Sequence, residues 1–232
     1  MTAILSNLQA VRAAIHRAAH AANRNAESVT LLAVSKTFPP SAIREAYAAG
    51  QTCFGENYLQ EALDKMQALA DLPIEWHFIG PIQSNKTRPI AENFSWVHSV
   101  DRLKVAERLS EQRPPDLPPL NICLQVNISG EESKSGATPH EVSALAHAIS
   151  RLPRLKLRGL MAIPAPADDE AAQRKPLSAM RALLQQVNSE GLQLDTLSMG
   201  MSHDMAAAIL EGSTMVRIGT AIFGIRTRTE KS

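Results

Sequence analysis

TLLAVSKTFPPSAIREAYAAGQTCFG, residues 30–55, predicts a strand, a helix and a second strand in close succession. Residues 30–36 are rich in β-formers, and residues 52–55 form the next short strand after a helical segment closed by Gly50. Two strands joined through a helix run parallel. The stretch is therefore a βα unit of a parallel sheet.

The same unit recurs along the chain. Further strands are predicted at 74–79, 95–100, 120–127, 155–163, 196–199 and 214–219, with helical segments between them. One of these helices is predicted from Thr138 as N-cap, with Pro139 at its first position. Eight strands close a (β/α)8 TIM barrel. An open doubly wound sheet is the alternative, but it usually has a Gly-rich turn where this chain has SKTFPPS, 35–41.

Bulk properties exclude several classes of function. No linker or composition break divides the chain, so we predict one domain over 1–232, with an extra amphipathic helix in its first 25 residues. The 24 Lys and Arg nearly balance 23 Asp and Glu, which argues against nucleic acid as a partner. No apolar run has the length of a membrane span or a signal peptide, so we expect a cytoplasmic protein without a membrane partner. Cys53 and Cys123 are expected to be reduced core residues, and histidine spacing predicts no metal site.

Polar residues cluster at the predicted ends of the strands, where TIM barrels place their active sites. They are Lys36, Glu56, Asn57, His77, Ser99, Asp101, Asn127, Lys134, Ser202, Arg217, Gly219 and Thr220. Each has an ordinary structural explanation when taken singly: Lys36 as a solvated strand end, Ser202 as a helix cap, or Arg217 as a partner of Glu211. Their position on one rim favours a ligand site.

Two segments on this rim predict a phosphate site. In SMGMSHDMAAAIL, 198–210, Gly200 allows close backbone approach, and Ser202 is the predicted N-cap of a helix whose first N–H groups face the barrel mouth. Gly219 and Thr220 follow strand eight, next to Lys36 at the end of strand one. A lysine beside a phosphate suggests a Schiff base, and pyridoxal phosphate carries both an aldehyde and a phosphate. A sugar-phosphate enzyme without Schiff-base chemistry is an alternative that leaves Lys36 less specified.

Six segments, spanning about residues 30–226, resemble one known family. They are LLAVSKT (31–37), FGENYLQE (54–61), WHFIGPIQSNK (76–86), SGEESKSG (129–136), RGLMAIP (158–164) and LSMGMSHDMAAAILEGSTMVRIGTAIFG (197–224). The chain resembles the pyridoxal-phosphate homeostasis proteins, the YggS/PROSC family. The resemblance implies a single barrel like the N-terminal domain of alanine racemase, with pyridoxal 5'-phosphate as its cofactor.

The resemblance also implies roles for particular residues. Lys36 would hold the cofactor as a Schiff base, Met201, Ser202, Gly219 and Thr220 would bind its phosphate, and Arg217 would face its pyridine nitrogen. Asn57 and His77 would line the pocket, Met161 would lie against the ring, and Lys134 would lie near the carboxylate of an amino-acid adduct. Phe38 and His203 depart from the family pattern, which puts in doubt any contact that those side chains would make.

Two functions follow from the resemblance. The first is a monomeric carrier, without enzymatic turnover, that holds the cofactor and supplies it to pyridoxal-phosphate-dependent apo-enzymes. The second is an amino-acid racemase of weak activity. Two-base racemisation needs a proton shuttle on each face of the substrate, and in alanine racemase one is a tyrosine from a second domain. Tyr47 and Tyr58 are not placed to replace it, and the chain ends just after the barrel. We therefore expect the carrier.

Overall fold

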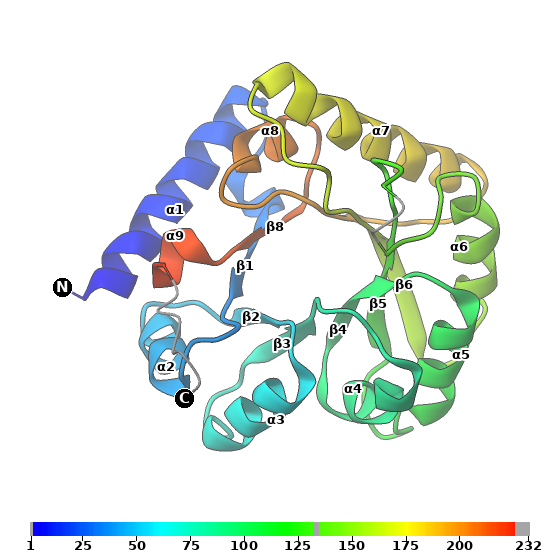
Figure 1. Ribbon diagram of the computed structural model, residues 1–232, viewed down its shortest axis with the longest axis horizontal. Helices are drawn as coiled ribbons and strands as arrows, with labels where there is room; N and C mark the ends of the chain where they lie inside the picture. Colours follow the sequence, from blue (N-terminus) through cyan, green and yellow to red (C-terminus); the bar gives the residue numbers. More distant parts are fainter. Residues whose placement is uncertain (1, 132–134, 226–232) are drawn as a thin grey trace.

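The computed structural model describes residues 2–131 and 135–225, whose eight strands form one closed parallel barrel in sequence order (Figure 1). The strands are β1 (Thr30–Val34), β2 (Cys53–Glu56), β3 (Glu75–Phe78), β4 (Trp96–Val100), β5 (Leu120–Gln125), β6 (Leu155–Met161), β7 (Thr196–Ser198) and β8 (Met215–Ile218). The barrel closes because β8 pairs with β1, with Leu32 beside Arg217. The predicted TIM barrel is confirmed, and the open sheet is excluded.

Helices connect the strands and form the outer layer of the molecule. They are α1 (Ala3–Ala21), α2 (Pro40–Ala48), α3 (Leu59–Ala68), α4 (Thr87–Asn93), α5 (Leu103–Gln112), α6 (Val142–Ser150), α7 (Glu170–Ser189), α8 (Met205–Leu210) and α9 (Thr220–Phe223), with short 3-10 turns η1 (Ala26–Ser28) and η2 (Ser84–Lys86). As predicted, α2 ends just before Gly50, which has a φ of 83°.

One helix begins a turn later than the sequence predicts. α6 starts at Val142 with Glu141 as its N-cap, so the expected start at Pro139 after a Thr138 cap is wrong. The Glu141 carboxylate accepts hydrogen bonds from the N–H and the hydroxyl of Thr138, at 2.8 and 2.7 Å. These bonds hold 138–141 in a separate turn.

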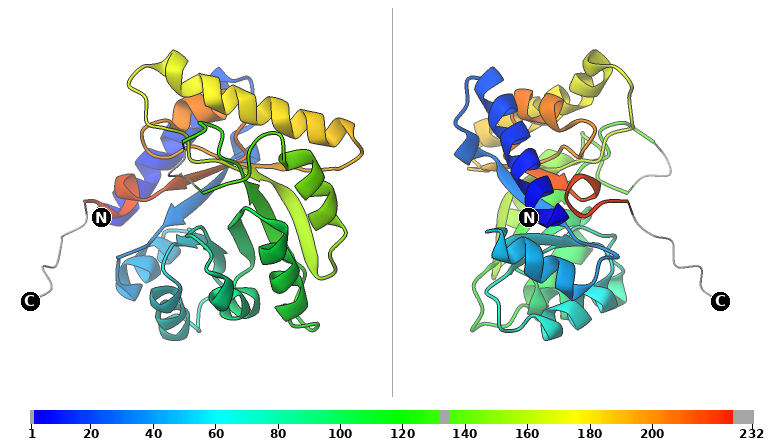
Figure 2. Two further views of the ribbon diagram at one scale, coloured as in Figure 1. Left: turned by 45° about the vertical axis from the view of Figure 1, so that its right-hand side comes forward. Right: turned by 90° about the vertical axis from the view of Figure 1, so that its left-hand side faces the viewer.

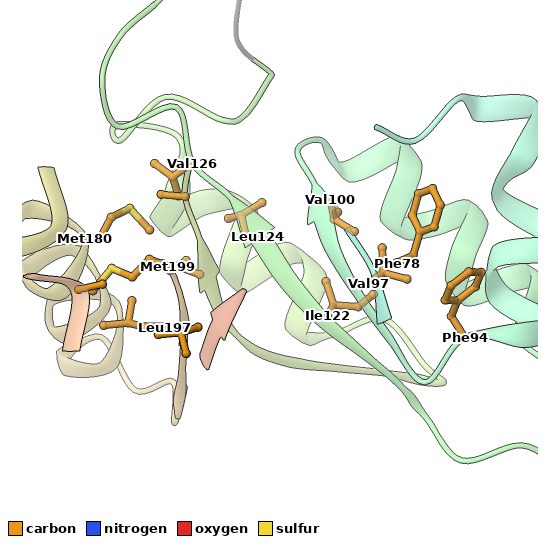
Figure 3. Packing of buried hydrophobic residues seen from close by; sticks show 14 of the residues in the cluster. Phe78, Phe94, Val97, Val100, Ile122, Leu124, Val126, Met180, Leu197 and Met199 are labelled. Atoms are coloured by element: carbon orange, nitrogen blue, oxygen red, sulfur yellow. The ribbon is translucent and has the colours of Figure 1, made fainter. Parts of the chain in front are cut away.

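Apolar side chains fill the layer between the strands and the helices. In Figure 3, Phe78, Phe94 and Val97 lie together on one side, and Met180 of α7 lies near Met199 on the other. The Phe78 and Phe94 rings pack edge to face, with centroids 5.2 Å apart. Because side chains alternate along a strand, the neighbours of each outward residue point into the barrel.

The barrel interior holds a second, smaller apolar cluster. Leu32, Trp96, Cys123, Met161 and Met215 form it, and all five are buried. Cys123 is therefore a reduced core residue, as expected. Polar side chains from the same inward face lie beside this cluster, and they are described with the site below.

α1 covers the seam where the two ends of the chain meet. It packs beside α8 and α9 on the β8 and β1 side of the barrel (Figures 1 and 2). Asn7 Nδ2 donates to the carbonyl oxygen of Ile222 at 2.9 Å, and Arg24 Nη1 donates to that of Ile209 at 2.8 Å. The predicted N-terminal amphipathic helix is confirmed. Among the described residues, no helix is both long enough and apolar enough to cross a membrane.

Candidate functional site

Lys36 lies in a tight turn at the C-terminal end of β1. Ser35 still follows the sheet, because its N–H donates to the carbonyl of Gly55 at 3.0 Å. The chain then reverses: Thr37 has a left-handed φ of 69°, and the Phe38 N–H donates to the Ser35 carbonyl at 3.1 Å. The observed strand is thus shorter than the predicted one, and Lys36 is a half-buried residue of the rim.

A buried charged cluster beneath this turn fixes its backbone. Lys65 Nζ donates to the Ser35 carbonyl at 2.9 Å, to Glu56 Oε1 at 2.8 Å and to Glu61 Oε1 at 2.5 Å. The same Glu61 oxygen accepts the N–H of Thr37 at 2.6 Å. Ser35 and Thr37, the residues on either side of Lys36, are therefore held by Lys65 and Glu61 respectively. Neither Lys65 nor Glu61 was among the predicted site residues.

Arg217 lines the site from inside the barrel, on the neighbouring strand β8. It is only 5% exposed, its Nη1 donates to Ser198 Oγ at 2.8 Å and its Nη2 to the Ala162 carbonyl at 2.9 Å. Burial lowers the pKa of Arg217 to about 10, although the charge of Asp204 acts against this. The guanidinium therefore remains charged at neutral pH. Arg217 does not pair with Glu211, the structural explanation that the sequence allows. Glu211 forms ion pairs with Arg174 and Arg181 of α7 instead.

A chain of hydrogen bonds runs through the barrel interior from Arg217 to Glu75. Ser198 Oγ lies 2.8 Å from His98 Nδ1, His98 Nε2 lies 2.9 Å from His77 Nδ1, and His77 Nε2 lies 2.9 Å from Glu75 Oε1. Arginine can only donate and a carboxylate can only accept, so two neutral rings satisfy every link when each donates from Nε2. Burial lowers the pKa of both histidines, which keeps them neutral. This series of hydrogen bonds, which lies deeper in the barrel than the site, fixes the orientation of Arg217.

The turn after β7 differs from its prediction. α8 starts at Met205 with Asp204 as its N-cap, so Ser202 is not the cap. The Asp204 carboxylate accepts the N–H of Met201 at 2.6 Å, which takes that amide away from any ligand. Gly200 has a φ of 99°, and a Cβ there would lie 2.6 Å from the Ala208 Cβ. The predicted close approach of the backbone at Gly200 is therefore observed, packed against α8.

The chain after β8 passes close to β1. A Cβ on Gly219 would lie 3.1 Å from the Val34 carbonyl oxygen, so the position has room for little more than glycine. Thr220 then begins α9, in which Ile222 and Phe223 donate to the Gly219 carbonyl at 2.9 and 3.0 Å, so the N–H groups of Thr220 and Ala221 are those without an acceptor within the helix. Phe223 of α9 packs against Phe38, with ring centroids 5.1 Å apart.

These elements enclose a cavity of about 260 Å³ at the C-terminal mouth of the barrel. It is lined by Val34, Lys36, Asn57, Ile79, Ile163, Met201, Ser202, His203, Arg217, Gly219 and Thr220. A second cavity of about 360 Å³ lies next to it and shares Asn57, Ile79 and Ile163 as walls. Among the described residues, no donor reaches the buried Oδ1 of Asn57. Asn57 as a residue lines both cavities.

Seven of the nine residues predicted to bind a cofactor line this one cavity: Lys36, Asn57, Met201, Ser202, Arg217, Gly219 and Thr220. The other two lie deeper in the barrel. His77 is completely buried with both ring nitrogens bonded to protein groups, and Met161 is completely buried in the interior cluster. Lys134 lies outside the described residues. Sequence reasoning missed Val34, Ile79 and Ile163, because an apolar residue at a strand end looks like any core residue.

Comparisons with known proteins place the chain among close relatives. The family model described as the alanine racemase N-terminal domain matches residues 6–227. The chain is 64% identical over 226 residues to the pyridoxal phosphate homeostasis protein of Pseudomonas aeruginosa, with 97% of each chain covered. It is 53% identical over 234 residues to the protein of that name in Escherichia coli K12, with 100% of each covered.

Solved structures give the same result. PipY of Synechococcus elongatus PCC7942, with pyridoxal phosphate bound, aligns with a TM-score of 0.83 at 38% identity, over 95% of this chain and 100% of PipY. Alanine racemase of Corynebacterium glutamicum aligns with a TM-score of 0.68 at 17% identity, over 99% of this chain and 63% of the racemase. The second likeness is one of fold alone.

Proposed function

Because this chain belongs to the alanine racemase N-terminal domain family, and within it to the pyridoxal phosphate homeostasis proteins, we propose that it binds pyridoxal 5'-phosphate in the Lys36 cavity and serves the intracellular homeostasis of this cofactor. The observation that carries the proposal is the pairing of Lys36 and Arg217 in one cavity at the barrel mouth. The bound cofactor in PipY supports the choice of ligand.

The residues of the cavity suit this ligand. Lys36 supplies the amine that would hold the cofactor aldehyde as a Schiff base. The main-chain N–H groups at the start of α9, with the hydroxyls of Ser202 and Thr220, are donors suited to a phosphate. Arg217 contacts only neutral acceptors among the described residues, so its charge and its remaining N–H groups are available to a ligand. Asn57 lines the same cavity with its polar side chain.

The same geometry favours a carrier over an enzyme. When bound, pyridoxal phosphate supplies an electron sink that depends on a protonated ring nitrogen. A buried, permanently charged arginine beside that nitrogen would keep it unprotonated, because two positive charges repel. A racemase also needs a second proton-transfer group, and neither Tyr47 nor Tyr58 lines the cavity. We propose that the protein, as a cytoplasmic monomer, passes the cofactor to apo-enzymes.

Borohydride trapping tests the proposal. The protein is incubated with pyridoxal phosphate and reduced, and the modified lysine is identified by peptide mass spectrometry. We expect label on Lys36, loss of that label in Lys36→Ala with an unchanged circular dichroism spectrum, and full label in the control Lys86→Ala, which replaces an exposed lysine. Label spread over surface lysines would contradict the proposal.

The racemase alternative is tested with the same loaded protein. We expect no turnover of L-alanine above that of the free cofactor, measured by the D-alanine formed. Turnover that is lost in Lys36→Ala would establish the enzyme instead of the carrier.

A further inference from the structure

The opposite end of the barrel carries a group of side chains that the proposed function does not use. Cys53 begins β2 and pairs in register with Glu75, the first residue of β3. His77 follows Glu75 by two residues, so all three side chains point to the same, inward face. This is the N-terminal rim, where conservation usually reflects stability and not catalysis. The cluster is therefore separate from the cavity of Lys36.

Distances within this cluster match those of a metal site. Cys53 Sγ lies 3.5 Å from Glu75 Oε1, His77 Nε2 lies 2.9 Å from the same oxygen, and the three ligand atoms all lie within 4.8 Å of one another. A tetrahedral zinc ion, with bonds of about 2.3 Å to sulfur and about 2.0–2.1 Å to nitrogen and oxygen, holds its ligand atoms roughly 3.3–3.6 Å apart. Side-chain shifts of up to about 1 Å would bring the three ligand atoms to these distances.

The histidine of the cluster is held as a ligand would be. Metal-bound histidines usually have their second ring nitrogen fixed by a hydrogen bond. His77 has this support, because its Nδ1 lies 2.9 Å from His98 Nε2 and its ring stacks on Trp96 with an interplanar angle of 8°. Glu75, by contrast, has a side chain 46% exposed, so the cluster opens to solvent on one side. A water molecule can complete the coordination there.

Charges around the cluster also suit a cation. Cys53 is a free thiol as expected, but it is only half-buried and packs against the edge of the interior apolar cluster instead of lying within it. Arg158 is the nearby cation that acts on Glu75, but Asp195 neutralises it with an ion pair of 2.8 Å.

We propose that Cys53, Glu75 and His77 bind one divalent transition-metal ion of the zinc class, with water as the fourth ligand. The mixed sulfur, nitrogen and oxygen set suits a borderline ion and not magnesium or calcium. Binding releases the thiol proton to solvent and moves the ring proton of His77 from Nε2 to Nδ1, facing His98. The ring proton of His98 moves likewise from Nε2 to Nδ1, so His98 accepts at Nε2 and donates from Nδ1 to Ser198 Oγ, and the hydroxyl proton of Ser198 turns away from His98. Arg217 donates to the same oxygen.

Cobalt titration of the metal-free, cofactor-free protein tests the site. Co²⁺ bound to a thiolate gives a charge-transfer absorption in the near ultraviolet, and we expect this band to saturate at one ion per chain and to vanish when Zn²⁺ is added. Cys53→Ser should abolish the band, and Glu75→Gln should weaken binding at least about 100-fold, the upper end of what a supporting residue alone contributes. The control Cys123→Ala, which removes the other thiol, should keep the band.

Absence of the band in the parent protein, or a band that survives Cys53→Ser, would overturn the proposal. Circular dichroism of each variant verifies that it is folded. Because the titration uses no pyridoxal phosphate, its outcome is independent of borohydride trapping at Lys36.

Discussion

Glu56 shows how a single residue can support a site without touching a ligand. Its side chain is completely buried, and it accepts hydrogen bonds from Lys65 and from the Ser35 hydroxyl, at 2.8 and 2.6 Å. Burial raises the pKa of Glu56, whereas the charge and hydrogen bond of Lys65 act to lower it. A buried ion pair of this kind contributes little net stability but becomes costly when one partner is lost. Here it also holds the backbone beside Lys36.

Removal of Lys65 should therefore destabilise the protein in a pH-dependent way. We expect Lys65→Met to lower the free energy of unfolding by about 3–5 kcal/mol at pH 8, because it leaves Glu56 buried and unpaired. The pKa of Glu56 would rise further, so below that pKa the folded state binds a proton that the unfolded state has released. The loss of unfolding free energy, relative to the parent protein, should then become smaller as the pH falls toward 5, by up to about 1.4 kcal/mol per pH unit.

The matched control is the double variant Lys65→Met/Glu56→Gln, in urea unfolding at several pH values. The double variant has no ionisable group at residue 56. Its loss of unfolding free energy should therefore be smaller than that of Lys65→Met at pH 8 and should not vary with pH. A deficit of Lys65→Met that is constant from pH 8 to pH 5 would contradict this account.

At the scale of elements, the turn between β7 and α8 depends on the geometry of Gly200. Its φ of 99° is unfavourable for a side chain, and a Cβ would also meet Ala208 at 2.6 Å. Gly191, after α7, has a similar φ of 103° but nothing within 4 Å of a Cβ. The two positions therefore separate backbone strain from steric overlap.

We expect Gly191→Ala to cost about 1–2 kcal/mol of unfolding free energy, the strain alone. Gly200→Ala should cost at least about 3 kcal/mol, because α8 or the turn must also move. Urea unfolding of both variants measures the difference. Equal costs would mean that the turn yields freely and does not pack rigidly on α8.

The sequence predicted elements better than it predicted positions within them. Every observed strand lies within two or three residues of its prediction, because β-formers and helix formers alternate strongly along the chain. His77 was expected in the cofactor cavity but lies deeper, because the depth of a residue in a barrel depends on the stagger between strands. Ser202 and Asp204 are both good caps, and sequence alone does not distinguish them. The Cys53, Glu75 and His77 cluster depends on the register between β2 and β3, which no local pattern encodes.

At the scale of the whole molecule, the described structure is one closed barrel to which α1 is joined on its outer surface. The tryptophans Trp76 and Trp96 lie in β3 and β4, whereas Asn7 of α1 contacts α9 near β8. If the chain is one domain, a change at one place must affect unfolding at the other.

Asn7→Ala should therefore shift all unfolding signals together. Loss of its hydrogen bond to Ile222 should lower the free energy of unfolding by about 0.5–1.5 kcal/mol. Urea unfolding followed by tryptophan fluorescence and by far-ultraviolet circular dichroism should show the same shifted midpoint and an unchanged slope. If the midpoint measured by circular dichroism moved while the midpoint measured by fluorescence did not, the single-domain prediction would be wrong.

The pairing of β1 with β8, covered by α1, also constrains how the protein is made. When residues 1–200 have been synthesised, α1 and β1 have β2 and α2 beside them but lack β8, α8 and α9, which they contact in the finished barrel. Part of the apolar face of α1, which includes Leu8, Val11 and Ile15, stays uncovered during that time. The nascent chain thus exposes apolar surface until late in synthesis, and α1 reaches its final place only after β8, α8 and α9 have been made.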